Sequence, residues 1–348
     1  MKVLLTGSAG FIGSQVGRRL AECGHDVVGV DAMIAQAHVA GGAAPSGTHH
    51  LDVRDAEGMA RLLGGVDVVC HQAAMVGNGI DAQDLPHYAA NNDLGTAVLL
   101  AAMARAGVDR LVLASSMVVY GDGAFRCEEH GGVDAAPRRA ADLERGMFDP
   151  RCPRCDRVLD WAMVDENAPF RPRTSYAASK VAQEHYAAAW CTLQRGTCIA
   201  LRYHNVYGPH MPADTPYAGV AAVFRSALER GEAPRVYEDG RQMRDFVHVR
   251  DVAGANLAAI ERVAAHPSGV TAYNVGSGRP FTVGQMADVV ASAAGGPPPV
   301  TTGAFRAADV RHVVADSSQA REGLDWRASI EPEQGLVEFA TAPLRATR

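Results

Sequence analysis

Short apolar runs alternate with longer helical patterns through the first two thirds of the chain. Continuous apolar, β-branched stretches predict buried strands at residues 3–5, 26–31, 66–71, 110–115 and 198–203. Helical spacing predicts intervening helices at residues 12–23, 95–106 and from Lys180 to about 193. Strands that are apolar throughout are typical of a parallel sheet covered by helices on both faces. The pattern therefore predicts an α/β fold with a doubly wound parallel sheet.

Two parts of the chain depart from this rhythm. Residues 121–167 are polar and rich in Arg, Asp and Cys, which predicts an insertion. The last third mixes helices, turns and short strands, as expected of a smaller C-terminal α/β substrate lobe. We predict a cofactor domain from residues 1–120 and 168–205 with a return segment at about 243–275, and a substrate lobe from residues 206–242 and 276–348. His49 and His50 are predicted to lie in a solvated loop.

A glycine-rich turn follows the first predicted strand and opens the first helix. Glycines there let the backbone approach a pyrophosphate, which the amides of the helix N-terminus bind. Strand, turn, helix and second strand follow one another in the order of a Rossmann-type dinucleotide site. We expect the turn to bind the cofactor through Gly7, Gly10, Phe11, Ile12 and Gly13.

Asp31 ends the second strand, where a carboxylate accepts hydrogen bonds from the ribose hydroxyls of a dinucleotide. The same charge repels a 2′-phosphate, so the predicted cofactor is NAD rather than NADP. Asp52 and Val53 follow the third strand and are expected at the adenine edge, with helix capping as the alternative role for Asp52. Ala73 and Ala74 leave room for the cofactor near the carboxyl edge of the sheet.

Tyr176 and Lys180 are four residues apart in a predicted helix, so their side chains share a face. A phenol titrates near pH 10 and is a poor base at neutral pH. An ammonium group one turn away favours the phenolate, so the pair predicts a general base. The spacing alone is common by chance, and the dinucleotide site in the same chain gives it weight.

Cysteines cluster within the insertion. Cys127 and His130 form one short pair, Cys152 and Cys155 form another, and 21 residues separate the two pairs. Three thiolates and an imidazole suit tetrahedral zinc, and four protein ligands leave no position open for catalysis. The pattern therefore predicts a structural zinc site. The alternative is a flexible loop with incidental cysteines.

Length and composition exclude several classes of protein. At 348 residues, 47% hydrophobic and 21% charged, the chain has the composition of an ordinary enzyme. A net charge of −6 argues against a general nucleic-acid binder. No apolar run approaches the roughly 20 residues that cross a bilayer. The chain opens directly into a strand, without the apolar region of a signal peptide. We therefore expect a cytoplasmic protein with no membrane or nucleic-acid partner.

Six ordered segments give the chain a family resemblance. They lie at residues 6–13, 92–96, 115–121, 176–180, 201–209 and 244–252. Together they resemble the extended short-chain dehydrogenase/reductase family, and within it the nucleotide-sugar epimerases and dehydratases. The resemblance covers nearly the whole chain except the insertion. The paired cysteines of the insertion resemble a bacterial subgroup of dTDP-L-rhamnose 4-epimerases.

The resemblance implies roles for residues of the site. It implies that Ser116 hydrogen-bonds the reacting hydroxyl and that Tyr176 is the base. Lys180 would bind the nicotinamide ribose and lower the pKa of Tyr176. Asn92 belongs to the expected cofactor-binding residues.

The resemblance also implies a nucleotide-diphosphate sugar as substrate. Asn205 and Arg244 would bind its diphosphate, and Arg306 is similar to the second arginine of that clamp. Guanidinium groups and an amide suit a diphosphate, which offers many acceptors and two negative charges. The resemblance further implies a homodimer that pairs helices including the one with Tyr176.

The residues after Ser116 separate the reactions of the family. Related dehydratases carry Thr-Asp-Glu where this chain has Ser116, Met117 and Val118. Met and Val do not transfer protons, which disfavours dehydration and decarboxylation. One base suffices for 4-epimerisation of a dTDP- or UDP-(deoxy)sugar through a transient 4-keto sugar, which is the favoured function. The alternatives are a nucleotide-sugar 4-reductase or dehydrogenase and a non-catalytic dinucleotide-sensing protein.

Overall fold

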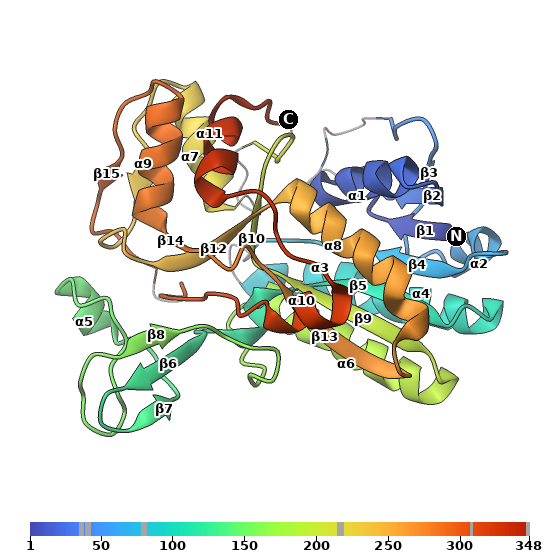
Figure 1. Ribbon diagram of the computed structural model, residues 1–348, viewed down its shortest axis with the longest axis horizontal. Coiled ribbons are helices and arrows are strands. Elements are labelled where there is room, and N and C mark those ends of the chain that lie inside the picture. Colours follow the sequence, from blue (N-terminus) through green and yellow to red (C-terminus); the bar gives the residue numbers. More distant parts are fainter. Residues whose placement is uncertain (35–37, 39–42, 78–81, 214–218, 307–308, 346–348) are drawn as a thin grey trace.

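The computed structural model describes residues 1–34, 38, 43–77, 82–213, 219–306 and 309–345 (Figure 1). Its centre is a seven-stranded parallel sheet in the order β13-β9-β5-β4-β1-β2-β3. The strands are β1 (Lys2–Thr6), β2 (Asp26–Asp31), β3 (Thr48–His50), β4 (Val68–His71), β5 (Arg110–Ser116), β9 (Thr197–Tyr203) and β13 (Gly269–Val275). The strand order reverses between β1 and β4. Open α/β sheets bind ligands at the carboxyl ends of their strands beside such a reversal.

Helices cover both faces of this sheet. On one face lie α1 (Phe11–Glu22), α8 (Val249–Arg262) and α10 (Ser318–Leu324). On the other face lie α2 (Ala56–Leu62), α4 (Gly95–Ala106) and α6 (Ser175–Gln194). Alternate residues of each strand belong to the two cores, as Val3 does to the first and Leu4 to the second. Burial on both sides explains the continuous apolar strands and confirms the predicted Rossmann-type fold.

A smaller lobe stands at the carboxyl edge of the sheet. Its three-stranded sheet contains β10 (Asn205–Tyr207), β12 (Met243–His248) and β14 (Pro280–Thr282), and its two-stranded sheet contains β11 (Arg235–Val236) and β15 (Val300–Thr301). It packs against α7 (Val220–Glu229), α9 (Val283–Ala293) and α11 (Pro332–Thr341), which gather at the upper left of Figure 1. Most of these segments fall within residues 206–242 and 276–348, the ranges expected for the substrate lobe, whereas β12 falls in the predicted return segment at about 243–275 and β10 begins one residue before the predicted lobe. The division into domains stays a prediction.

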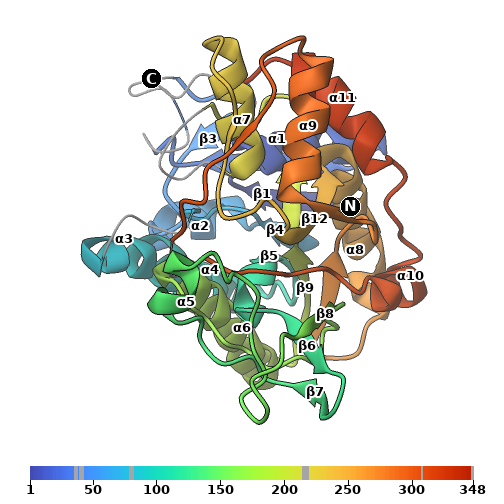
Figure 2. The ribbon, with the colours of Figure 1, turned by 90° about the vertical axis from the view of Figure 1, so that its left-hand side faces the viewer.

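The insertion forms a small unit of its own beneath the smaller lobe (Figures 1 and 2). Its antiparallel sheet has the order β7-β6-β8. The elements are β6 (Ala124–Cys127), β7 (Gly131–Val133), α5 (Ala140–Glu144) and β8 (Asp160–Ala162). Its core consists of a few side chains that include Phe125, Cys127, Cys152 and Leu159. The short helices elsewhere are η1 (Ala82–Asp84), α3 (Leu85–Tyr88), η2 (Ala89–Leu94), η3 (Met117–Tyr120) and η4 (Val263–Ala265).

The structure corrects one local prediction. His49 and His50 belong to edge strand β3 rather than to a loop. This strand pairs only with β2, and both histidines are exposed, so it lacks the apolar pattern of the inner strands. Over the described ranges, no helix is both long and apolar enough to span a bilayer.

Candidate active site

One cavity of about 780 Å³ extends along the carboxyl edge of the sheet to the smaller lobe. Of the site residues predicted outside the insertion, all but Asn92 line it. They are Gly7, Gly10, Phe11, Ile12, Gly13, Asp31, Asp52, Val53, Ala73, Ala74, Ser116, Tyr176, Lys180, Asn205, Arg244 and Arg306. The cavity therefore joins the expected cofactor residues to the expected substrate residues.

The glycine-rich turn depends on the absence of side chains. Gly7 has a φ of 68°, and a Cβ built on it would lie 2.7 Å from the amide nitrogen of Ala73. A Cβ on Gly13 would lie 2.0 Å from the carbonyl oxygen of Gly7. Gly10 precedes α1 and provides no side-chain cap, and the first turn holds no acidic residue. The first amides of α1 are therefore available to an anion, which fits a dinucleotide pyrophosphate.

Asp31 is held in its ionised form at the end of β2. Its carboxylate accepts hydrogen bonds from the amides of Ala9 (3.0 Å) and Met33 (2.8 Å), and His38 Nε2 lies 3.3 Å away. Burial acts to raise the pKa of Asp31, but the hydrogen bonds from His38 and the two amides lower it below its usual value. An ionised carboxylate beside the turn suits ribose hydroxyls. Sequence reasoning missed His38, which no motif marks.

Asp52 lines the cavity with its carboxylate paired to Arg54, whose Nη2 lies 2.6 Å away. Hydrogen bonds from Arg54 lower the pKa of Asp52. The capping role considered for Asp52 belongs instead to Asp55, which accepts a hydrogen bond from the Gly58 amide at the start of α2.

Asn92, predicted among the cofactor-binding residues, is not among the residues that line the cavity. Asn92 is fully buried and binds both backbone groups of Met75, accepting from its amide (2.7 Å) and donating to its carbonyl (2.9 Å). It also donates to Ser179 Oγ (2.8 Å) in α6. Because Met75 lines the cavity, Asn92 supports the site from behind. A sequence motif alone does not reveal which way such a side chain faces.

The residues predicted to be catalytic come from two neighbouring elements. Ser116 is the last residue of β5, and Tyr176 lies in the first turn of α6, which Thr174 caps through a hydrogen bond from the Ala177 amide (3.1 Å). Lys180 Nζ donates to the Ala114 carbonyl (2.8 Å) and lies 5.8 Å from the Tyr176 ring centroid. The predicted pair thus shares one face of the helix and meets the end of β5.

Burial dominates the titration of this pair. It raises the pKa of Tyr176 to about 12, against the opposing effect of a hydrogen bond with Ser116. It lowers the pKa of Lys180 to about 7, although Glu184 attracts the ammonium charge. We expected Lys180 to lower the pKa of Tyr176, and in the structure burial is the larger effect. Tyr176 is therefore a protonated phenol at neutral pH, and a further positive charge beside it would be needed to favour the phenolate.

The side chains that surround Ser116 in the cavity include few other groups able to transfer protons. Met117 and Val118 line the cavity, as their positions predicted. His204 also lines it. Burial lowers the pKa of His204 to about 3, so its imidazole is neutral and a weak base.

The far end of the cavity carries positive charge. The Arg244 guanidinium is fixed by hydrogen bonds of 2.5–2.9 Å to three backbone carbonyls. Burial lowers the pKa of Arg244 to about 10, which leaves it charged at neutral pH. Arg306 lies over the ring of Tyr237, 5.4 Å from its centroid. Asn205 Oδ1 is buried without a hydrogen-bond partner among the described residues. The two cations suit a diphosphate ligand, and the Asn205 amide would meet it through its N–H groups.

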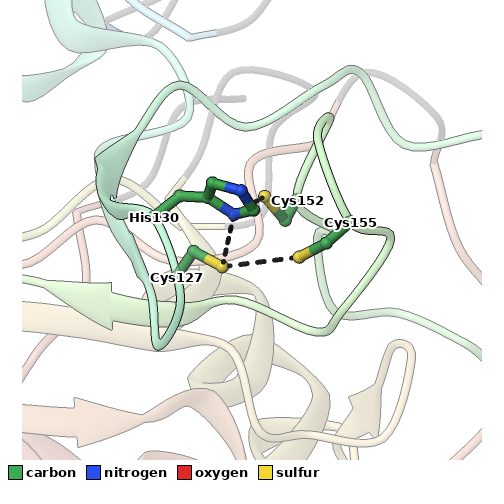
Figure 3. A group of neighbouring side chains, drawn as sticks. All are labelled: Cys127, His130, Cys152 and Cys155. Atoms are coloured by element: carbon green, nitrogen blue, oxygen red, sulfur yellow. Dashed lines mark hydrogen bonds between the residues drawn. The ribbon is translucent and has the colours of Figure 1, made fainter.

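Cys127, His130, Cys152 and Cys155 converge in the insertion, as predicted, and Figure 3 shows their side chains pointing toward one another. Cys127 Sγ lies 3.5 Å from His130 Nδ1 and 3.6 Å from Cys155 Sγ. Cys152 Sγ lies 3.7 Å from His130 Nδ1. Zn–S bonds of about 2.3 Å and Zn–N bonds of about 2.0 Å place tetrahedral ligand atoms about 3.5–3.8 Å apart. The donor set and its spacing fit zinc.

A buried ion cluster attaches the insertion to the smaller lobe. Arg138 donates to Glu238 (2.7 Å), and both side chains are under 10% exposed. Arg311 donates to the other oxygen of Glu238 (2.8 Å), to Asp239 (2.7 Å) and to Asp149 of the insertion (2.8 Å). Glu238 lines the cavity, so these contacts link the insertion to the substrate end. No local motif predicted them.

Known proteins resemble the chain over nearly its whole length. It is 35% identical to the dTDP-L-rhamnose 4-epimerase of Burkholderia thailandensis, covering 98% of this chain and 94% of the relative. The structure matches that of Thermotoga maritima UDP-glucose 4-epimerase with UDP-glucose, with a TM-score of 0.77 and 29% identity over 98% and 97% of the chains. It also matches Thermus thermophilus UDP-glucose 4-epimerase in complex with NAD, with a TM-score of 0.76 and 28% identity over 98% of each chain.

A sequence model of a protein family also matches most of the chain. The model of the NAD dependent epimerase/dehydratase family matches residues 3–140 and 161–276. The unmatched stretch between them lies inside the insertion and contains Cys152 and Cys155. With the glycine-rich turn, Asp31 and the Tyr176–Lys180 pair in one cavity, these matches show that the chain belongs to the NAD dependent epimerase/dehydratase family.

Proposed function

We propose that the chain is an NAD-dependent nucleotide-sugar 4-epimerase. The observation that carries this proposal is the cavity surface beside Ser116. Tyr176 and Lys180 meet Ser116 there, while Met117 and Val118 stand where a dehydratase needs an acid and a base. One reversible proton transfer at one carbon matches this set of side chains.

The residues of the site divide the reaction between them. Ser116 hydrogen-bonds the sugar 4-oxygen, and Tyr176 accepts its proton as the C4–H bond breaks. The glycine-rich turn, Asp31 and Lys180 would hold NAD, which would supply a reversible hydride acceptor for C4 and a positive charge that favours the Tyr176 phenolate. Arg244 and Arg306 bind the diphosphate while the 4-keto sugar rotates between oxidation and reduction at C4. Tyr176 then returns the proton to the oxygen of the inverted centre.

The direct test is product analysis of the purified protein without added cofactor. We expect bound NAD in the preparation and inversion at C4 of the sugar, followed by NMR. Stoichiometric consumption of added NADH would favour the reductase instead. A product that has lost water or carbon dioxide would refute the proposal.

We propose a dTDP-deoxysugar as the substrate class. The support is the 35% identity to a dTDP-L-rhamnose 4-epimerase over nearly the full length of both chains. In a panel of dTDP-L-rhamnose, UDP-glucose and UDP-N-acetylglucosamine, we expect the highest kcat/KM for the dTDP-sugar. Equal or better turnover of the UDP-sugars would overturn the substrate assignment and leave the epimerase proposal intact.

We also propose that Cys127, His130, Cys152 and Cys155 bind one structural zinc ion. Support comes from the donor set and from sulfur and nitrogen separations close to those of tetrahedral coordination. Metal analysis should find one zinc per chain in the parent protein and in Cys23→Ser, whose cysteine is exposed and outside the cluster. Cys152→Ser should lose it. A parent protein free of zinc after purification without chelators would exclude the site.

Two expectations from the sequence stay predictions. We propose a homodimer, to be tested by light scattering coupled to gel filtration. We propose a cytoplasmic location, to be tested by cell fractionation of the native host.

A further inference from the structure

The C-terminal segment is fastened beside the cofactor turn. The His210 amide donates to the Pro343 carbonyl (2.8 Å). Arg345 donates its amide to the Met211 carbonyl (3.0 Å) and accepts at its own carbonyl from the Ala213 amide (2.9 Å). These bonds form a short parallel bridge between Arg345 and Pro212. The backbone of Arg345 is therefore fixed, although it lies near the end of the chain.

The Arg345 side chain reaches the glycine-rich turn. Its Nη1 donates to the Ala9 carbonyl (2.7 Å), inside the turn between Gly7 and Gly10. It lines the same cavity as both glycines. Its Nε is buried without a hydrogen-bond partner among the residues that the structure describes. Within that part of the chain, no carboxylate is ion-paired with its guanidinium.

Among the described residues, this arrangement places a cation without an ion-pair partner beside a helix N-terminus whose first amides are available to an anion. The first amides of α1 carry partial positive charge, and no side chain caps them. Burial lowers the pKa of Arg345, while the charge of Asp31 opposes that effect, so the arginine is a costly group to leave unpaired. A guanidinium has a planar fork of donors that matches two phosphate oxygens. An anion at this point would satisfy both the amides and the arginine.

We propose that Arg345 is a cofactor-binding residue whose guanidinium binds the pyrophosphate of NAD, so that the C-terminal segment holds the cofactor in place. The inference rests on the proposed function, because it takes NAD as the cofactor. It adds a contact from a residue 336 positions away from the turn it meets. It also accounts for the fixed backbone at residues 343–345, which holds the arginine over the turn.

The test is cofactor binding rather than turnover. Arg345→Ala and Arg345→Lys are stripped of bound nucleotide and titrated calorimetrically with NAD, ADP and adenosine. Arg327→Ala, which removes an exposed arginine, is the matched control. We expect Arg345→Ala to raise the Kd for NAD and ADP about ten- to a hundred-fold, the usual effect of losing charge-assisted hydrogen bonds. Arg345→Lys should lose less, and Arg327→Ala should match the parent.

Adenosine separates a phosphate contact from a change in the shape of the site. It lacks phosphates, so its Kd should not change in any variant. Equal losses for adenosine and NAD, or no loss for NAD, would overturn the proposal. If Arg345 governs NAD binding but no nucleotide sugar is converted, the proposed function fails while this inference stands.

Discussion

Arg138 offers a sharp test of how the insertion is attached. The change Arg138→Met keeps most of the apolar stem and removes the guanidinium that joins the insertion to Glu238. The same guanidinium donates to the carbonyls of Asp309 (2.5 Å) and Phe148 (3.3 Å). The variant therefore loses one buried ion pair and two charge-assisted hydrogen bonds. It leaves the Glu238 carboxylate buried.

The size of the effect follows from what remains around Glu238. Removing one partner of a buried ion pair costs about 3–5 kcal/mol when the other charge is left alone. Glu238 keeps Arg311 at 2.8 Å, so we expect the lower end, about 3 kcal/mol. Before the change the cluster holds Arg138 and Arg311 against Glu238, Asp239 and Asp149. The change increases its excess of negative charge, which is the physical source of the cost.

Urea unfolding measures the loss, with Trp161 in β8 as a fluorophore inside the insertion. The matched control is Arg139→Met, one position along, where the side chain is 64% exposed and pairs with Asp142. Asp142 keeps Arg145 as a partner at 2.6 Å, so the control should lose much less stability than Arg138→Met. The double variant Arg138→Met/Glu238→Gln should recover part of the loss, because it removes the unpaired charge together with its partner. Equal unfolding of Arg138→Met and Arg139→Met would refute the reasoning.

Three further predictions concern the residues around the base. Tyr176→Phe should lower kcat about 10²- to 10⁴-fold while retaining bound NAD, and an NMR assay showing undiminished turnover would remove Tyr176 from the mechanism. The pKa of Lys180 is about 7 in the folded protein and 10.5 in the unfolded chain, so the unfolded state binds more protons between these two pH values. The contribution of Lys180 to the free energy of unfolding of the parent protein therefore rises with pH in this range. The stability gained by Lys180→Met, measured by urea unfolding, should therefore shrink from pH 7 to pH 10, and a constant gain would contradict the shifted pKa. Glu184→Gln leaves Arg202 buried without its carboxylate partner at 2.8 Å and should cost about 3–5 kcal/mol, whereas a loss under about 1 kcal/mol would show that the pair is dispensable.

The large sheet was predictable because its strands are buried on two faces. Residues 111–114 and 198–201 are apolar throughout, and both stretches contribute side chains to the two cores. Edge strand β3 escaped detection because Thr48, His49 and His50 pair on one side only and carry polar side chains. The strands of the insertion escaped because their core is a few side chains around the Cys/His cluster, too small to impose an apolar period.

The site was predictable where chemistry follows local spacing and unpredictable where it depends on distant contacts. A pattern of a few consecutive residues is enough to identify the glycine-rich turn, Asp31 and the Tyr176–Lys180 pair. Arg345 meets Ala9 across 336 positions, and Arg138 meets Glu238 across 100. Such contacts form only when the chain folds, so no local sequence motif predicts them.

These distant contacts share a physical purpose in the proposed reaction. A sugar that rotates between two chemical steps must be free to move, while its diphosphate and the cofactor stay bound. Arg345 fixes one end of the cavity at the cofactor turn, and the Arg138–Glu238–Arg311 cluster fixes the other beside Arg244. The middle of the cavity, at Met117 and Val118, contributes apolar side chains that make no hydrogen bonds to a sugar. Rigid ends and a weakly bonded middle are what a rotating 4-keto sugar requires. The change Met117→Gln should therefore slow epimerisation, because the amide would bind one orientation of the sugar. The 4-keto sugar should then accumulate in single-turnover NMR. Unchanged turnover by Met117→Gln would argue against a freely rotating intermediate.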